Sequence, residues 1–153
     1  MFLVTSDWVD GNLVLRDKDG AEIATVNGTT GTIQLPDDSS VNEFLLTLDI
    51  ADGSADATYY LVSPYAGTIK KIYTVTDGAV GTADITVTGK IGSTAITDGA
   101  VTIATSGSAA GDVDSVTPSA ENVITAGAAM NFVVAGGGSG GTPRIRVTVV
   151  LER

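Results

Sequence analysis

Residues 59–91, YYLVSPYAGTIKKIYTVTDGAVGTADITVTGKI, contain the pattern that decides the fold. Thr, Val, Ile and Tyr dominate three runs in this stretch, and the apolar side chains in them recur at every second position. Successive side chains of a β-strand point to opposite faces, so each run predicts a strand with one buried and one solvent-facing side. We expect these strands to form the centre of a β-sandwich. They span residues 59–62, 68–76 and 83–90.

The chain beyond residue 41 continues with short β-rich runs and turns. Turn signals recur at intervals of roughly 8 to 12 residues, and no run has a helical period of useful length, which is typical of all-β sandwiches and barrels. The pentapeptide Thr-Asp-Gly-Ala-Val occurs at 76–80 and again at 97–101, and we interpret both copies as hairpin turns. The further predicted strands are residues 44–50, 95–96, 100–104, 129–135 and 144–151.

A separate group of short strands precedes this domain. Turns containing Gly20 and Gly28 join them, so we predict a three-stranded meander that is too small to be stable alone. Phe2 and Trp8 are large apolar residues ahead of the meander, and we expect packing to anchor both. The three predicted strands are residues 12–16, 22–26 and 32–35.

The clearest break in the chain is Pro36-Asp37-Asp38-Ser39-Ser40, which combines a proline, like charges and small polar residues. We place the domain boundary there. The sequence therefore predicts an N-terminal β arm over residues 1–40 and a β-sandwich domain over residues 41–153.

Composition excludes most enzyme mechanisms. The chain has 153 residues, enough for one domain with a real core, and it contains no cysteine and no histidine. Disulfides, thiolate nucleophiles, the usual zinc sites and imidazole acid–base catalysis are thereby removed. A pair of carboxylates could still hydrolyse glycosides, but no pair stands out from the general acidity. We expect a protein that is not an enzyme and has no cofactor.

The first residues lack the basic segment and the long apolar core of a signal peptide, and no run approaches 18 apolar residues. We therefore expect the protein to be made in the cytoplasm of the producing cell.

Charge is distributed unevenly along the chain. The net charge is −10, and residues 1–60 contain 11 acidic against 2 basic residues, a balance of −9. Phosphates of nucleic acids and anionic membrane surfaces would repel such a chain, so neither is an expected partner. Two interpretations of the acidic part remain open: a solvated face that maintains solubility, or a surface that docks on a basic protein.

Three motifs resemble ligand sites and have simpler explanations. The alternate acids of residues 17–22 and the cluster Asp49, Asp52 and Asp56 could bind calcium, but hairpin turns and acidic loops explain the same residues. The glycine-rich residues 136–141 could cradle phosphate, but a strand follows them instead of a helix, so a long flexible hairpin loop is the better interpretation. We predict no metal site.

Most of the aromatic residues of the sandwich are expected in or near its core. The two exceptions that we consider are Tyr60 and Tyr65, either of which could instead anchor an interface.

Three segments of the chain resemble one family of phage proteins. They are Trp8 to Val14 with the Asp-Gly turn after it, Val62 to Ile69, and Ser108 to Ser115, together with Ala126-Gly127 and the closing Val147 to Leu151. In these packing and turn residues the chain resembles the small β-sandwich head decoration (capsid cement) proteins of tailed bacteriophages. The likeness spans nearly the whole chain, and other phage fibre and tail modules share such residues.

The resemblance implies a β-sandwich, jelly-roll-like virion protein, a homotrimer, that binds the outer capsid surface and bridges neighbouring major capsid subunits. The N-terminal arm is the segment that we assign to capsid or intersubunit contact. The alternative is a receptor- or carbohydrate-binding module of a phage fibre, tail or cell surface, which should expose an aromatic cluster. The interface candidates are Phe2, Trp8, Asp10, Asp17, Tyr60 and Tyr65.

Overall fold

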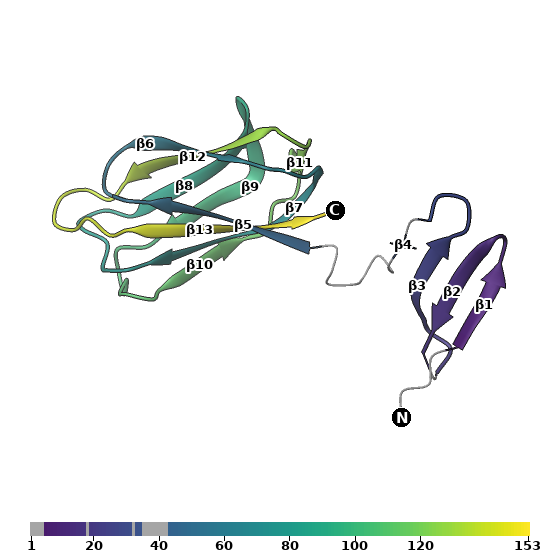
Figure 1. Ribbon diagram of the computed structural model, residues 1–153. Helices are drawn as coiled ribbons and strands as arrows, with labels where there is room; N and C mark the ends of the chain where they lie inside the picture. The colour runs from purple at the N-terminus through teal and green to yellow at the C-terminus, as the bar shows by residue number, and fades with distance from the viewer. Residues whose placement is uncertain (1–4, 18, 32, 35–42) are drawn as a thin grey trace. The chain divides into compact units, whose positions relative to one another are not determined.

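The computed structural model describes residues 5–17, 19–31, 33–34 and 43–153, apart from the side chain of Gln34. The chain forms two compact units, residues 1–42 and residues 43–153, which are described separately (Figure 1). Within the described ranges every regular element is a β-strand, and all the strand pairs are antiparallel. The predicted all-β class is therefore confirmed. No helix in these ranges has the length and apolar character needed to cross a membrane.

The first unit contains a four-stranded antiparallel sheet, which we call the N-terminal sheet. Asp10 and Gly11 join its first two strands, and both have positive φ angles of 49° and 80°, as a tight two-residue hairpin turn requires. The sequence predicted three strands here and missed the first one. In order across the sheet the strands are β1 (Thr5–Val9), β2 (Asn12–Arg16), β3 (Glu22–Asn27) and β4 (Ile33–Gln34).

The second unit is a β-sandwich of two sheets. One sheet has the strand order β10-β7-β13-β5, with β11 also paired to β7, and we call it the β13 sheet. The other has the order β6-β12-β8-β9, and we call it the β12 sheet. The strands are β5 (Glu43–Ile50), β6 (Ala57–Val62), β7 (Gly67–Thr76), β8 (Ile85–Ile91), β9 (Thr94–Ile103), β10 (Val113–Val116), β11 (Val123–Ile124), β12 (Ala129–Gly136) and β13 (Ile145–Glu152).

The core of the sandwich lies between the inner faces of these two sheets. Phe132 and Val87 project from the β12 sheet and are fully buried, and Ile72 and Val149 are their counterparts on the β13 sheet. Burial alternates along these strands, as the period-two pattern predicted. Removing an apolar side chain of this size from water contributes about 1.5–3 kcal/mol, so the sandwich has a core of its own.

Neighbouring strands in each sheet are mostly distant in the sequence. The first and last strands of the sandwich, β5 and β13, pair along their whole lengths, from Glu43 opposite Glu152 to Ile50 opposite Ile145 (Figure 1). The two strand orders are compatible with a jelly roll, which stays a prediction.

Most of the predicted strands of the sandwich are confirmed. The runs at 59–62, 68–76 and 83–90 are β6, β7 and β8, and the predictions at 95–96 and 100–104 belong to the single strand β9. The interpretation of the repeated pentapeptide as two hairpin turns was wrong for both copies. The first copy, residues 76–80, leaves the end of β7 for a loop that leads to β8 in the other sheet, so it does not join paired strands. Residues 97–101 lie inside β9, where Asp98 takes a positive φ of 56° at an irregularity of the pairing with β8. Strands β10 and β11 were not predicted.

Candidate functional site

An apolar row crosses the whole N-terminal sheet and is the most conspicuous surface feature of the first unit. Residues directly opposite each other in antiparallel strands project from the same face. Trp8 lies opposite Leu13, Leu13 opposite Val26, and Val26 opposite Ile33. Trp8 is 71% exposed and Ile33 is 65% exposed. We call these four residues the apolar row.

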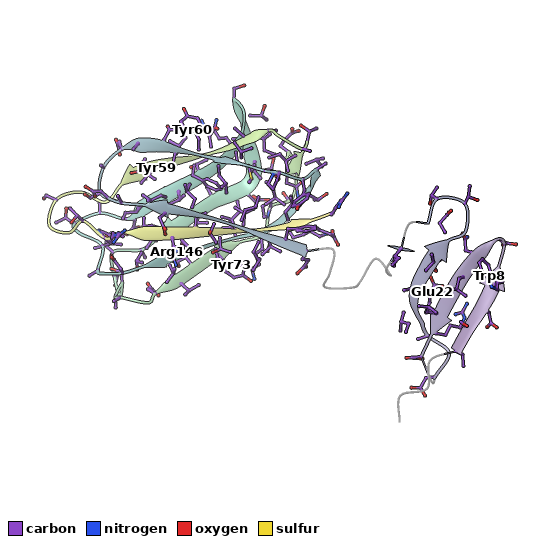
Figure 2. All side chains as sticks on the ribbon, in the orientation of Figure 1. Trp8, Glu22, Tyr59, Tyr60, Tyr73 and Arg146 are labelled. Carbon is purple, nitrogen blue, oxygen red and sulfur yellow. The ribbon has the colours of Figure 1, made fainter. Side chains whose placement is uncertain are left out.

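Trp8 is exposed, because β1 is an edge strand and all five of its residues are exposed (Figure 2). The expectation that it is anchored stays a prediction. The turn at Gly28 nevertheless limits the space around the ring. A Cβ atom at Gly28 would lie 3.3 Å from Cζ3 of Trp8 and would collide with the carbonyl oxygen of Gly11. Glycine at this position lets the ring lie close to the turn.

The other candidates in the first unit have different positions. Asp10 is exposed at the hairpin tip, next to the strand that carries Trp8. Asp17 closes the next turn, because its Oδ1 accepts hydrogen bonds of 2.9 Å from the backbone N–H groups of Asp19 and Ala21. The structure therefore brings Trp8 and Asp10 to one end of the hairpin and gives Asp17 a turn-forming role. Phe2 lies outside the described residues.

Tyr60 and Tyr65 have unlike environments in the sandwich. Tyr60 projects from the outer face of β6 and is 66% exposed, whereas Tyr59 beside it points inward (Figure 2). Tyr65 is stacked on Phe44 with ring centroids 4.6 Å apart, and the guanidinium of Arg153 lies 5.7 Å from its ring. Tyr60 is thus the better interface candidate of the two, because no aromatic or cation–π partner holds it among the described residues.

Charged groups on the outer face of the β13 sheet are largely paired with each other. Arg146 donates hydrogen bonds of 2.7 and 3.2 Å to the two carboxylate oxygens of Asp49, and these bonds lower the pKa of the Asp49 carboxyl. Lys70 lies 2.6 Å from Glu152. The Nζ atom of Lys71 lies 4.8 Å from the ring centre of Tyr73. This face is therefore a solvated, self-paired surface.

The carboxylates that might have bound calcium have separate partners. Asp52 accepts hydrogen bonds from the backbone N–H and the hydroxyl of Ser54, which lower the pKa of its carboxyl, and Asp56 accepts one from the backbone N–H of Gly136. Over the part of the chain that the structure describes, no group of three or more acidic side chains is arranged to hold a metal ion.

The glycine-rich loop joins β12 and β13, which lie in different sheets, so it is not the hairpin loop that the sequence predicted, and it is packed against neighbouring backbone. The N–H of Gly137 donates to the carbonyl oxygen of Asp84, so this group is not free to bind phosphate. A Cβ atom at Gly137 would lie only 2.8 Å from Cα of Ser54, and residues 136, 137, 138 and 140 all have positive φ angles. Close packing and backbone geometry explain the glycines.

Sequence reasoning did not single out Asp114 and Thr74, which lie opposite each other on β10 and β7. Oδ2 of Asp114 and Oγ1 of Thr74 are both buried, and neither has a hydrogen-bond partner. Desolvation, together with the charge of Asp112, raises the pKa of the Asp114 carboxyl. Alternation along β10 could have indicated that Asp114 points inward, had this short strand been predicted.

Comparisons with known proteins do not place the chain in a family. No family model and no curated protein matches it. Among solved structures, RmlC from Streptococcus suis in complex with dTDP-D-xylose aligns over 99% of this chain and 71% of that chain, with 7% sequence identity and a TM-score of 0.31. A likeness this weak carries no argument about fold or function.

Proposed function

We propose that the protein is a structural component of a phage virion, without catalytic activity, that binds the outer surface of an assembled capsid and bridges major capsid subunits. The observation that carries the proposal is the apolar row, which lies on a compact unit separate from the sandwich. The core cluster of the sandwich contains no residue of the first unit, so burial in that core does not require the small sheet. The resemblance to head decoration proteins supplies the identity of the partner.

Charge and exposed surface together define the partner surface that the N-terminal sheet would fit. Residues 1–42 contain 7 acidic and 2 basic residues, a balance of −5, while the apolar row itself carries no charge. A complementary surface would have an apolar centre and a basic rim. Trp8 would be the main anchor, because tryptophan is among the residues that contribute most to binding when desolvated.

Stabilisation of the capsid would follow from binding alone. A protein that binds only the expanded shell lowers the free energy of that state by its binding free energy. Repetition over many equivalent positions, with each homotrimer attached through several arms, multiplies the effect through avidity. Each contact needs only a standard interface of about 1,600 Å² in total.

The direct test is sedimentation of the protein with decoration-free heads, followed by cryo-electron microscopy of the pellet. The wild-type protein should pellet with the heads, give density on local symmetry axes and protect the heads against heating. Trp8→Ala should weaken binding by at least about 30-fold if Trp8 is an anchor worth 2 kcal/mol or more.

Val9→Ala is the matched control. Val9 is the next residue of β1, 45% exposed, and projects from the opposite face of the same strand. It should bind heads as the wild type does. Equal binding by the Trp8 variant, or by a chain lacking residues 1–36, would refute the assignment of capsid contact to the N-terminal sheet.

Carbohydrate binding is the alternative, and one observation favours it. Tyr60 lies in line with Asn131 and Lys90 across the outer face of the β12 sheet, which places an aromatic ring near two polar side chains. A glycan array probed with the isolated protein separates the two functions. Binding of a defined glycan that Tyr60→Ala abolishes, with no binding to heads, would reassign the protein to host recognition.

A further inference from the structure

Strand β6 differs from the other three edge strands of the sandwich. Strand β5 has the exposed acidic residues Glu43 and Asp49, and β10 has the inward-pointing Asp114. Strand β9 has an irregularity in its pairing with β8, and Thr97 bridges to Ala120, which covers part of its edge. The sequence of β6, ATYYLV, has no charge and no proline, and its pairing with β12 is regular. Natural proteins protect an exposed strand edge with such devices, and β6 has none of them.

Backbone groups of β6 are available for pairing at alternate residues. Ser63, directly after the strand, donates its N–H to the carbonyl oxygen of Ala128, on the side of β12. Hydrogen-bonding groups of an antiparallel strand alternate between its two sides. The N–H and C=O groups of Thr58, Tyr60 and Val62 therefore point toward the free edge. In the described part of the chain, β6 pairs with β12 alone.

We propose that the free edge of β6 binds β6 of a second copy of this chain, antiparallel and centred on Tyr60. In this register Tyr60 pairs with Tyr60 of the second copy, and Thr58 pairs with Val62. Each pair exchanges two N–H···O bonds. Residues directly opposite each other project from the same face of a sheet. Outer-face side chains would therefore meet outer-face side chains of the second copy, and inner-face side chains would meet inner-face ones. The two β12 sheets would join into one continuous sheet.

Charge makes β6 an edge at which a second copy meets little repulsion. The chain has a net charge of −10, so two copies repel each other at most surfaces. Strand β6 carries no charge, and its neighbours on the outer face of β12 are Ala129, Asn131 and Val133. Asp56 of one copy would lie opposite Pro64 of the other, which keeps the two Asp56 carboxylates at opposite ends of the pairing. The exposed ring of Tyr60 would be covered by its own symmetry mate.

The proposed contact is two-fold, so it is distinct from the homotrimer and from the capsid contact of the N-terminal sheet. It would join two trimers, or two single chains, through the sandwich. Its success or failure therefore does not depend on binding to heads.

Single-cysteine variants provide the test, because the chain contains no cysteine of its own. Directly opposite residues in a hydrogen-bonded antiparallel pair have Cα atoms about 5.5 Å apart, within the range that a disulfide spans. Tyr60→Cys should form covalent dimers under mild oxidation, and the reaction should approach completion. A contact about a three-fold axis would leave about a third of the thiols unpaired.

The register is tested with two further variants in which Tyr60 is intact. Thr58→Cys and Val62→Cys should each form few dimers alone and form mixed dimers efficiently when combined. Leu45→Cys is the matched control, since Leu45 is 67% exposed on edge strand β5, against 66% for Tyr60. Crosslinking of Tyr60→Cys no faster than Leu45→Cys, or equal self-crosslinking of all variants, would overturn the proposal.

Sedimentation velocity gives an independent measurement without oxidation. The wild type should show a concentration-dependent doubling of mass, and Tyr60→Lys should weaken this association at least tenfold by placing two like charges at the two-fold axis. Leu45→Lys should leave it unchanged. A wild-type mass that is constant over the whole concentration range would also overturn the proposal.

Discussion

At the scale of single residues, Asp114 is an uncompensated group whose removal should stabilise the protein. A carboxyl with a raised pKa binds its proton more tightly in the folded state. The contribution of Asp114 to the free energy of unfolding should therefore fall as pH rises from about 4 through the raised pKa. Asp114→Asn cannot ionise, so it should be more stable than the wild type at pH 7 by about 1 kcal/mol. Urea unfolding of the wild type and the variant at pH 4 and at pH 7 measures this difference.

Below about pH 4 the wild-type carboxyl is protonated in both states, and the difference between wild type and variant should shrink. Asp112→Asn serves as a graded comparison, because Asp112 is the smaller cause of the raised pKa. It should stabilise in the same direction and by less. An equal gain at pH 4 and pH 7 would show that ionisation of Asp114 is not the cause.

Individual residues also show what cannot be predicted from the local sequence. The same five residues, Thr-Asp-Gly-Ala-Val, follow β7 as a loop at one place and lie within β9 at the other. Local preference alone cannot distinguish the two, because the pairing of β9 with β8 decides the second case. Trp8 is a similar case: its exposure follows from its place on the edge strand β1, which was not predicted.

At the scale of elements, the glycine-rich loop between β12 and β13 should depend on its glycines for packing. Gly137 and Gly127 have nearly equal φ angles of 83° and 80°, so alanine should cost similar backbone strain at both, about 1 kcal/mol. Only at Gly137 would the new methyl group collide with neighbouring backbone. Gly137→Ala should lower the melting temperature more than Gly127→Ala does. Calorimetry of the two variants measures the difference, and equal melting temperatures would contradict the packing argument.

Four of the long strands could be predicted because they have enough residues to show a period. Strands β7, β8, β12 and β13 have seven or more residues each, and their alternation is clear in the sequence. Strand β10 has four residues and β11 has two, too few for a period to be recognised. Strand β1, TSDWV, has three polar residues out of five, so its pairing with β2 stabilises it more than its own composition does.

At the scale of the whole molecule, the sandwich should fold without the N-terminal unit. All the residues of its core cluster lie at or beyond Ile50, and the described apolar residues that the N-terminal sheet buries are Val14 and Ala24. A chain of residues 43–153 should keep the melting temperature of the full-length sandwich to within about 3 °C. Residues 1–42 alone should be marginally stable at best, since chains this short rarely bury enough surface. Circular dichroism melts of both fragments check these expectations, and a sandwich fragment that fails to fold would contradict them.

The candidate surfaces could be predicted only in part, because they depend on strand order. Acidity of the first part of the chain and the presence of Trp8 were visible in the sequence. The register that lines up Trp8 with Ile33 was not, since β1, the strand that carries Trp8, was not predicted. Successive side chains of a strand point to opposite faces, so the sequence predicts that Tyr59 and Tyr60 do so. It does not predict that β6 is an edge strand, because pairing between distant segments decides the strand order.

The pairing of β5 with β13 has a consequence for how the protein is made. Strand β13 lies between β7 and β5, so the β13 sheet lacks an inner strand until residues 145–152 have left the ribosome. Until then β5 has no partner within its sheet, and the inner faces of β5 and β7 cannot close over the core. Contacts between residues so far apart in sequence form slowly. The sandwich should therefore fold only after residues 145–152 have emerged, and the nascent chain has to avoid aggregation through that interval.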